Sequence, residues 1–187
     1  AGARDVYVYF DNDEKTKAPF DARRLMERLD LHERMCTVMD DLTIYLAGEI
    51  HAPWRDELRE LLDARSLPAD ISYVGPQEVH DRSDDIGEDI LGTQPGARYR
   101  DLMGGQVNNL RRRVQMNRAD LCVAYFGPKY KQWNTAADAG AAAAMDIPVI
   151  LVRDIEHLHA LKDLDAFAAV TVETLEQAAA VIAYIFE

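Results

Sequence analysis

The sequence carries little positive charge: 21 lysines and arginines stand against 33 aspartates and glutamates, for a net charge of −12. Binding to a nucleic-acid backbone or an anionic membrane needs clustered positive charge, so neither is an expected partner. One basic cluster exists, Arg111-Arg112-Arg113, in a predicted helix whose successive side chains point in different directions. A solvated helix face is the favoured interpretation, and a contact to a nucleotide phosphate is the alternative.

Cysteine and long apolar runs are also scarce. The two cysteines, Cys36 and Cys122, are too few for a disulfide framework, and Cys122 lies in an apolar run where a buried thiol is expected. No apolar run approaches the roughly 20 residues of a membrane span, and the N-terminus has no signal-peptide core. These absences predict a soluble protein of the cytoplasm.

The motifs of common cofactor and metal sites are missing. No strand is followed by GxGxxG, and neither GxxxxGK[ST], CxxC nor HExxH occurs. His51 and His80, with neighbouring carboxylates, are the remaining candidates for a metal site. We expect no cofactor and no bound metal.

What is present is a regular alternation of apolar strands and amphipathic helices. Strand patterns cover residues 42–47, 71–74, 121–126, 148–152 and 168–172, and helical patterns cover 53–65, 106–117, 156–164 and 175–186. The last helix has a capping box from Thr174 to Gln177. The polar residues 77–105 are interpreted as a long loop that binds a ligand or is disordered. The alternation predicts an α/β protein with a flavodoxin-like or Rossmann-like, doubly wound, parallel five-stranded sheet and helices on both faces.

The chain divides into two parts of unequal size. Residues 1–40 are interpreted as an appendage with a strand at 6–10 and a helix at 20–29, and residues 41–187 as the main domain. A domain of that length can bury one full core.

In a doubly wound sheet the ligand lies beyond the carboxyl ends of the strands. Those ends carry Gly48-Glu49, Gly75-Pro76 and Gly127-Pro128. After Gly127 come an aromatic loop and an alanine-rich helix that is expected to begin near Thr135, with Asp138 in its first turn. This strand, loop and helix start are the predicted centre of a ligand crevice.

Three segments then resemble a known family: IYLAGEIH at 44–51, VGPQEVHDRSDDIGEDILGTQP at 74–95, and ADLCVAYFGPKYKQWNTAADAGAAAA at 119–144. They are similar to the YtoQ family, which is grouped with the nucleoside 2-deoxyribosyltransferase-like proteins, and the resemblance covers residues 42–187. Separately, YVYFDND at 7–13 and the short helix after it resemble the tail of a YecE-like barrel domain, which would imply a gene fusion or a truncated upstream domain.

The first resemblance implies cleavage of an N-glycosidic bond by a carboxylate nucleophile that a tyrosine of the first strand positions. The matching residues are Asp138, where the wider superfamily usually has glutamate, and Tyr45. Gln132 stands near the place of an expected base-binding aspartate. Asp138 in place of glutamate and Gln132 in place of aspartate are thus two differences from the superfamily pattern, and both concern residues implied in transferase activity. The resemblance also implies a homo-oligomer in which subunits complete each other's sites.

Asp138 also has a purely structural interpretation. Thr135-x-x-Asp138 has the spacing of a capping box, and an acidic group in a first turn is stabilised by the helix dipole, typically by about 0.3–1 kcal/mol. The same dipole would lower the pKa of Asp138 and keep it ionised, which also suits a nucleophile.

The other candidates likewise have two interpretations. Tyr45 orients the carboxylate or is a core aromatic; Glu49 contacts a ribose hydroxyl or is solvated; Trp133 stacks on a base or only packs. The remaining candidate substrate contacts are Gly48, His80, Asp81, Gly127, Gln132 and Asn134. Asn134 is alternatively a helix cap, and His80 and Asp81 belong to a segment interpreted as a lid.

Two functions remain open from the sequence. The first is a nucleoside or nucleotide N-glycosidic hydrolase or 2-deoxyribosyltransferase-like enzyme with Asp138 as nucleophile. The alternative is a non-catalytic module that binds a nucleotide or ribosylated metabolite. In both, the partner is a small-molecule nucleoside or nucleotide.

Overall fold

The computed structural model describes residues 41–128 and 132–187. The appendage expected at residues 1–40, its strand and its helix lie outside the described residues, and so do residues 129–131 of the loop expected after Gly127. The division at residue 40 stays a prediction.

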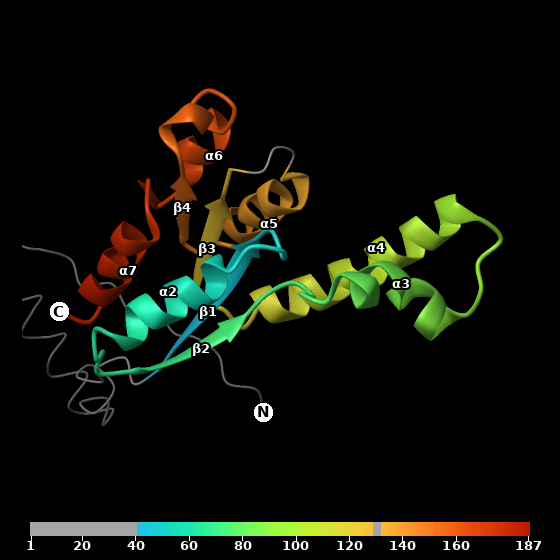
Figure 1. Cartoon of the computed structure of the whole chain (residues 1–187), viewed down its shortest axis with the longest axis horizontal. Helices are drawn as coiled ribbons and strands as arrows, with labels where there is room; N and C mark the ends of the chain where they lie inside the picture. The colour runs from blue at the N-terminus through green and yellow to red at the C-terminus, as the bar shows by residue number, and fades with distance from the viewer. Residues whose placement is uncertain (1–40, 129–131) are drawn as a thin grey trace, which may run out of the picture. The chain divides into compact units, whose positions relative to one another are not determined.

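The described residues form a parallel five-stranded sheet in the order β2-β1-β3-β4-β5 (Figure 1). The strands are β1 (Asp41–Gly48), β2 (Asp70–Val74), β3 (Leu121–Phe126), β4 (Val149–Arg153) and β5 (Val170–Val172). This order is the flavodoxin-like one, in which the chain reverses its direction of travel between β1 and β3. The predicted fold class is confirmed.

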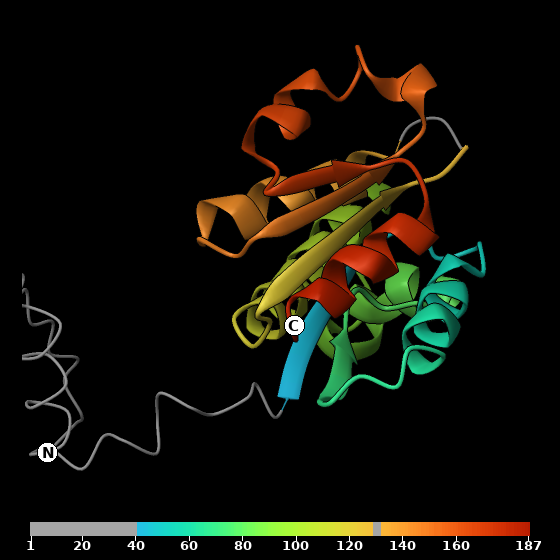
Figure 2. The same cartoon turned by 90° about the vertical axis from the view of Figure 1, so that its left-hand side faces the viewer.

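The helices cover both faces of the sheet. They are α2 (Trp54–Asp63), α3 (His80–Leu91), α4 (Ala97–Met116), α5 (Trp133–Ala144), α6 (Lys162–Phe167) and α7 (Leu175–Tyr184), with a short 3-10 turn η2 (Ile155–His157). Figure 2 shows α2 and α7 side by side on one face and α5 on the other. The predicted capping box of Thr174 and Gln177 is present at the start of α7. The helix expected over 156–164 is instead η2 and α6.

Two apolar clusters, one on each face, hold the layers together. Leu42, Ile44 and Leu46 of β1 pack beneath α2 and α7, while Tyr45 and Ala47 point to the opposite face beneath α5. Alternate residues of a strand point to opposite faces, and a parallel strand covered on both sides is therefore apolar throughout. The free thiol of Cys122 is fully buried in the second cluster, as expected.

The prediction of a long loop over residues 77–105 is wrong. Residues 80–91 and 97–116 form α3 and α4, which pack against each other as a hairpin that extends past the edge of the sheet (Figure 1). Gly87 and Gly104 allow this close packing, since a Cβ on Gly87 would lie 2.6 Å from the backbone nitrogen of Gly104. The hairpin buries few side chains, so its sequence lacks the apolar stripe that usually identifies a helix.

No helix within residues 41–128 and 132–187 is both long and apolar enough to cross a membrane.

Candidate functional site

The side chains of Tyr45 on β1 and Asp138 on α5 meet between the sheet and this helix. The Tyr45 hydroxyl donates a hydrogen bond to Asp138 Oδ2 at 3.2 Å. Tyr45 is fully buried on β1, an interior strand between β2 and β3, and Asp138 is only 4% exposed. The two side chains come from elements whose positions the sheet and its covering helix determine, so the contact is fixed by the fold.

The alternative interpretation of Asp138 as a capping residue is wrong. α5 begins at Trp133, two residues before the predicted start, which places Asp138 in the second turn. Gln132 occupies the N-cap position, and among the described residues no side chain caps this end by a hydrogen bond. The carboxylate oxygens of Asp138 are therefore directed at Tyr45 and at an arginine, not at the amides of its own first turn.

That arginine is Arg112 of α4, which the sequence interpretation left on a solvated face. Arg112 Nη1 lies 2.9 Å from Asp138 Oδ1, in an ion pair that is largely shielded from water. The neighbouring Arg111 donates to the carbonyl of Gly75 at the end of β2. The solvated interpretation is thus wrong for Arg112, whereas Arg111 is exposed, as expected, although it also donates this hydrogen bond. The direction of α4 could not be read from sequence, because the hairpin that orients it was interpreted as a loop.

Burial raises the pKa of Asp138 above its ordinary value, because the ionised form loses contact with water; Arg112 and the hydrogen bond from Tyr45 oppose that rise. The predicted lowering by a helix dipole is therefore wrong in direction. Burial, and then the charge of Asp138, raise the pKa of Tyr45. The Tyr45 hydroxyl keeps its proton at neutral pH and is available to donate to the carboxylate.

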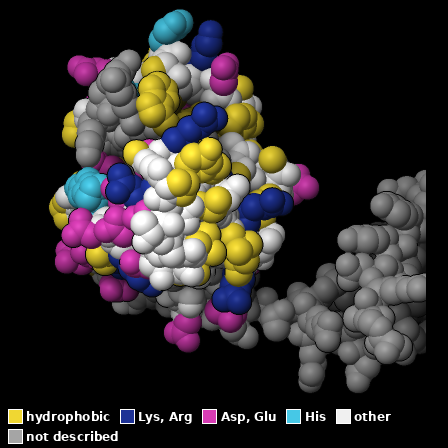
Figure 3. All heavy atoms as spheres, turned by 90° about the vertical axis from the view of Figure 1, so that its right-hand side faces the viewer, with side chains coloured by type: hydrophobic (Ala, Val, Ile, Leu, Met, Phe, Trp, Pro, Cys, Tyr) yellow, Lys and Arg dark blue, Asp and Glu magenta, His cyan; other side chains and the backbone are white. Residues whose placement is uncertain are grey.

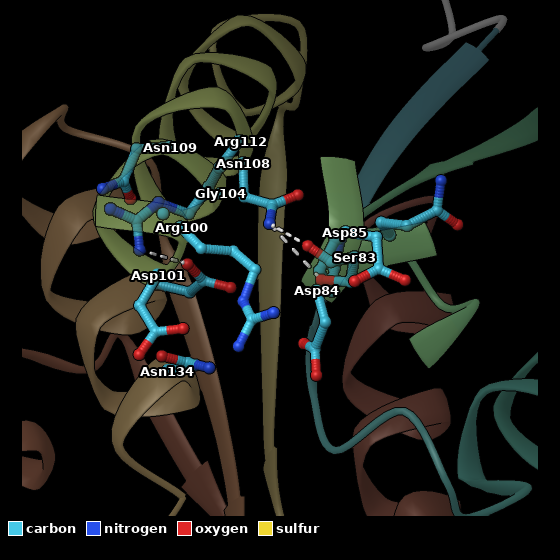
Figure 4. A pocket seen from close by; sticks show the side chains of 14 residues that line it. Ser83, Asp84, Asp85, Arg100, Asp101, Gly104, Asn108, Asn109, Arg112 and Asn134 are labelled. Atoms are coloured by element: carbon cyan, nitrogen blue, oxygen red, sulfur yellow. Dashed lines mark hydrogen bonds and ion pairs between the residues drawn. The ribbon is translucent and has the colours of Figure 1, made fainter. Parts of the chain in front are cut away.

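Two adjoining hollows open onto Asp138. The larger has a volume of about 680 Å³ and lies along the α3–α4 hairpin (Figure 4). The smaller has a volume of about 330 Å³ and lies beyond the end of β1. Six residues line both hollows: Pro76, Gln77, Ser83, Asp84, Asn134 and Asp138. Asp138 is thus at the junction of a two-part cleft.

The smaller hollow brings together most of the predicted substrate contacts. Six of them line it: Gly48, Glu49, His80, Gln132, Trp133 and Asn134. Asp81 and Gly127 line neither hollow; Asp81 is exposed on α3, and the buried Gly127 offers its carbonyl to Gln132 Nε2 at 2.9 Å. The fold does not bring those two residues into the cleft, contrary to the expectation.

The two described aromatic side chains nearest the loop after β3, Trp133 and Tyr125, do not enclose Asp138. Trp133 is 70% exposed and offers an open ring at the rim of the smaller hollow. Tyr125 stacks on Trp54, with ring centroids 4.9 Å apart, against the cluster on the opposite face of the sheet. Tyr125 therefore takes no part in shielding the carboxylate.

Two residues of α2 hold the backbone that follows β1, which forms one wall of the smaller hollow. Trp54 Nε1 and Arg55 Nη1 donate to the carbonyl of Glu49 at 3.0 and 2.7 Å, and Arg55 Nη2 donates to the carbonyl of Gly48 at 2.8 Å. A Cβ on Gly48 would lie 2.5 Å from the Trp54 ring, so the strand exit needs glycine. Arg55, which sequence reasoning missed, also helps to lower the pKa of Asp138 through its charge.

The site offers no metal-binding cluster among the described residues, where no three His, Cys, Asp or Glu side chains converge. The candidate ligands His51 and His80 meet edge to face, with ring centroids 5.3 Å apart, and His80 Nε2 lies 3.5 Å from Asp84 Oδ2. His51 therefore contacts His80, and His80 contacts Asp84 on its own helix, α3.

Comparison with known proteins agrees with the sequence resemblance. Residues 45–186 match the family described as "Nucleoside 2-deoxyribosyltransferase YtoQ". The YtoQ protein of Bacillus subtilis (strain 168) is 49% identical over 147 residues, which are 79% of this chain and 98% of that protein. Among solved structures, a 2-deoxyribosyltransferase from the psychrotolerant bacterium Bacillus psychrosaccharolyticus is similar with a TM-score of 0.45 and 14% identity, over 73% of this chain and 90% of that one. The chain described here belongs to the YtoQ family.

Proposed function

We propose that this protein cleaves the N-glycosidic bond of a nucleoside or nucleotide, with Asp138 as nucleophile and Tyr45 as the residue that orients it. The observation that carries the proposal is the arrangement of Asp138: a buried carboxylate with one oxygen on Tyr45 and the other on Arg112, at the junction of two hollows. A carboxylate held in this way is ready to approach a sugar carbon. The name of the family supports the same chemistry.

The reaction would take place in two steps. In the first step, a carboxylate oxygen of Asp138 forms a bond to C1′ while the bond from C1′ to the base nitrogen breaks. The electron pair of the broken bond stays with the base, which takes up a proton from water or from a titratable group. In the second step, water or the nitrogen of another base forms a bond to C1′, loses its proton, and frees the carboxylate. The partial positive charge that develops at C1′ is stabilised by the nearby Asp138 carboxylate in both steps.

The smaller hollow would receive the base. Trp133 presents an exposed aromatic face, on which any base can stack. Gln132 and Asn134 would contact polar edges of the base or the sugar, and Glu49 a sugar hydroxyl. Glu49, His51 and His80 are titratable groups on this side of Asp138, so a proton could reach the leaving base from one of them.

A panel of ribo- and deoxyribonucleosides and their monophosphates, followed by chromatography for free base, tests the proposal. Adding a second free base separates transfer from hydrolysis, since transfer yields a new nucleoside. The expected result is base release that Asp138→Asn abolishes. If intact ligands raise the melting temperature and remain unchanged, the non-catalytic binding module is the better description.

We also infer that the chain forms a homo-oligomer through the α3–α4 hairpin. Large apolar side chains are exposed along it: Ile90, Leu91, Tyr99, Leu102, Leu110 and Val114. α3 carries five acidic residues and one arginine, whereas α4 carries five arginines and one aspartate. Figure 3 shows acidic side chains gathered on one side of the face at this end, with apolar and basic ones on the other. A second copy related by a two-fold axis would pair α3 with α4 and cover these apolar groups.

Light scattering coupled to size exclusion tests this association. A dimer or larger assembly is expected, and Leu110→Glu with Val114→Glu should convert it to a monomer. A monomer for the unmodified chain would refute the inference. The free buried thiol of Cys122 suits a reducing compartment, so the cytoplasm remains the proposed location.

A further inference from the structure

The larger hollow is more spacious than the sugar of a nucleoside requires. With C1′ at Asp138 and the base toward Trp133, a nucleoside would occupy the smaller hollow of about 330 Å³. The larger one, of about 680 Å³, opens from the same carboxylate toward the α3–α4 hairpin. Both volumes are in the range of ligand pockets. The substrate therefore has room for a second, sizeable group attached to its sugar.

Charges of both signs line the larger hollow. Arg100 reaches into its middle, between Asp101 and Asp84, as Figure 4 shows, and no described residue forms a hydrogen bond or ion pair with this guanidinium. Asp85 and Asp101 likewise have no ion pair within the described part of the chain, while Asp84 faces His80. The second guanidinium in the lining, that of Arg112, is already paired with Asp138. As far as the described residues show, one unpaired guanidinium thus stands among three carboxylates.

This charge pattern discriminates between kinds of substituent. A phosphate would meet the attraction of Arg100 but also the repulsion of three carboxylates, Asp84, Asp85 and Asp101. A purely cationic group would leave Arg100 unpaired. None of the described residues that line this hollow is aromatic, so it offers no platform for a second base. A group that carries one positive and one negative charge satisfies both kinds of side chain.

We propose that the larger hollow binds an amino-acid-like, zwitterionic substituent on the 5′ side of the substrate. Its carboxylate would pair with Arg100 and its ammonium group with Asp84, Asp85 and Asp101. Asn109 and Asn134 supply amide donors and acceptors at the same wall, while the Asn108 amide is held by the Ser83 carbonyl at 2.8 Å. This inference rests on the proposed N-glycosidic cleavage, and it narrows the substrate to nucleosides with a zwitterionic 5′ extension.

Three probes with the same base and ribose test it: adenosine, adenosine 5′-monophosphate and S-adenosyl-L-homocysteine. Base release is measured with the unmodified protein, and dissociation constants by calorimetry with Asp138→Asn, which keeps the shape of the cleft. The zwitterionic probe is expected to bind at least about tenfold more tightly than adenosine, since charge-assisted hydrogen bonds are the strong ones. The monophosphate should bind no better than adenosine.

Arg100→Gln should remove that tenfold preference and leave the affinity for adenosine within about twofold. Arg98→Gln is the matched control, because Arg98 is exposed on the same helix and lines neither hollow. Independent of the base, titration with L-methionine and with inorganic phosphate, followed by NMR, should shift the side-chain amides of Asn108 and Asn109 only for the amino acid.

The outcomes separate this inference from the proposed function. If no probe or nucleoside is cleaved, the proposed function fails, and the affinities still decide the subsite. Tighter binding of the monophosphate than of the zwitterion, equal binding of zwitterion and adenosine, or no response of the asparagine amides to L-methionine would each overturn the subsite. Adenosine cleavage with any of these results leaves the proposed function intact.

Discussion

The hydroxyl of Tyr45 and the carboxylate of Asp138 are separated by 93 residues in the chain and by 3.2 Å in the fold. Tyr45 lies on β1 and Asp138 on the helix that follows the neighbouring strand β3, so the carboxyl-end crevice of a doubly wound sheet brings them together. The burial of both groups makes their hydrogen bond stronger than it would be in water, because the local dielectric is lower. The hydrogen bond therefore holds the carboxylate of Asp138, the proposed nucleophile, in a fixed position beside a fixed donor.

Replacing Asp138 with asparagine tests the nucleophile directly. The amide has nearly the same shape and can still accept from Tyr45, but it cannot form the glycosyl bond. We expect base release to fall by roughly three orders of magnitude or more, as for the loss of other nucleophiles. Circular dichroism and the melting temperature should show that the fold is retained. Unchanged turnover in a folded variant would remove Asp138 from the mechanism.

Tyr45→Phe keeps the buried ring and removes only the donor to Asp138. A hydrogen bond to a charged group is worth about 1.5–3 kcal/mol, so we expect the catalytic efficiency to fall by roughly 10- to 100-fold. Tyr73→Phe is the matched control, since the buried hydroxyl of Tyr73 has no hydrogen-bond partner among the described residues. Steady-state kinetics of both variants provide the comparison, and equal effects would mean that Tyr45 is only a packing residue.

Parts of the fold were predictable because their signals are local. The strand 121–126 is a continuous apolar run, and Thr174 and Gln177 are three residues apart, so both could be recognised from neighbouring residues. The α3–α4 hairpin could not, since its helices bury little more than glycine and give no apolar stripe. Its stability comes from contacts between two segments, which no single window of sequence contains.

The candidate site, too, was predictable from the sequence only in part. Asp138 and Tyr45 were identified through family resemblance, and the geometry brings them together. Arg112 was missed because its direction depends on how α4 leaves the hairpin. The pKa of Asp138 was predicted with the wrong sign, since the helix start was placed two residues late and the burial of the carboxylate was unknown. A dipole effect was expected where desolvation dominates.

The pH dependence of activity should report on the pair of Arg112 and Asp138. Burial raises the pKa of Asp138, and the guanidinium of Arg112 is the largest influence that lowers it. The nucleophile must be ionised, so activity is present above this pKa and is lost as the pH falls through it. Arg112→Gln removes the lowering influence and should move the acid limb of the pH profile to higher pH.

A profile of kcat/KM against pH for Arg112→Gln, with Arg113→Gln beside it, provides the measurement. Arg113 is the exposed neighbour on α4, and its replacement should leave the acid limb where it is. An acid limb that moves to lower pH in Arg112→Gln, or an identical shift in both variants, would contradict the assignment of Arg112 as the residue that keeps Asp138 ionised.

The packing of the hairpin can be tested with two glycines, one on each of its helices. A Cβ on Gly87 would lie 2.6 Å from the backbone nitrogen of Gly104, and because backbone must move, Gly87→Ala should destabilise the protein by about 1–3 kcal/mol. A Cβ on Gly105 would meet no described atom within 4 Å, so Gly105→Ala should stabilise the protein by about 0.5–1 kcal/mol through helix propensity. Urea denaturation measures both changes. If the hairpin folds as one unit with the sheet, the urea midpoints of Gly87→Ala and Gly105→Ala must move in opposite directions. If its two helices instead separate without affecting the rest of the chain, the midpoint of Gly87→Ala stays unchanged.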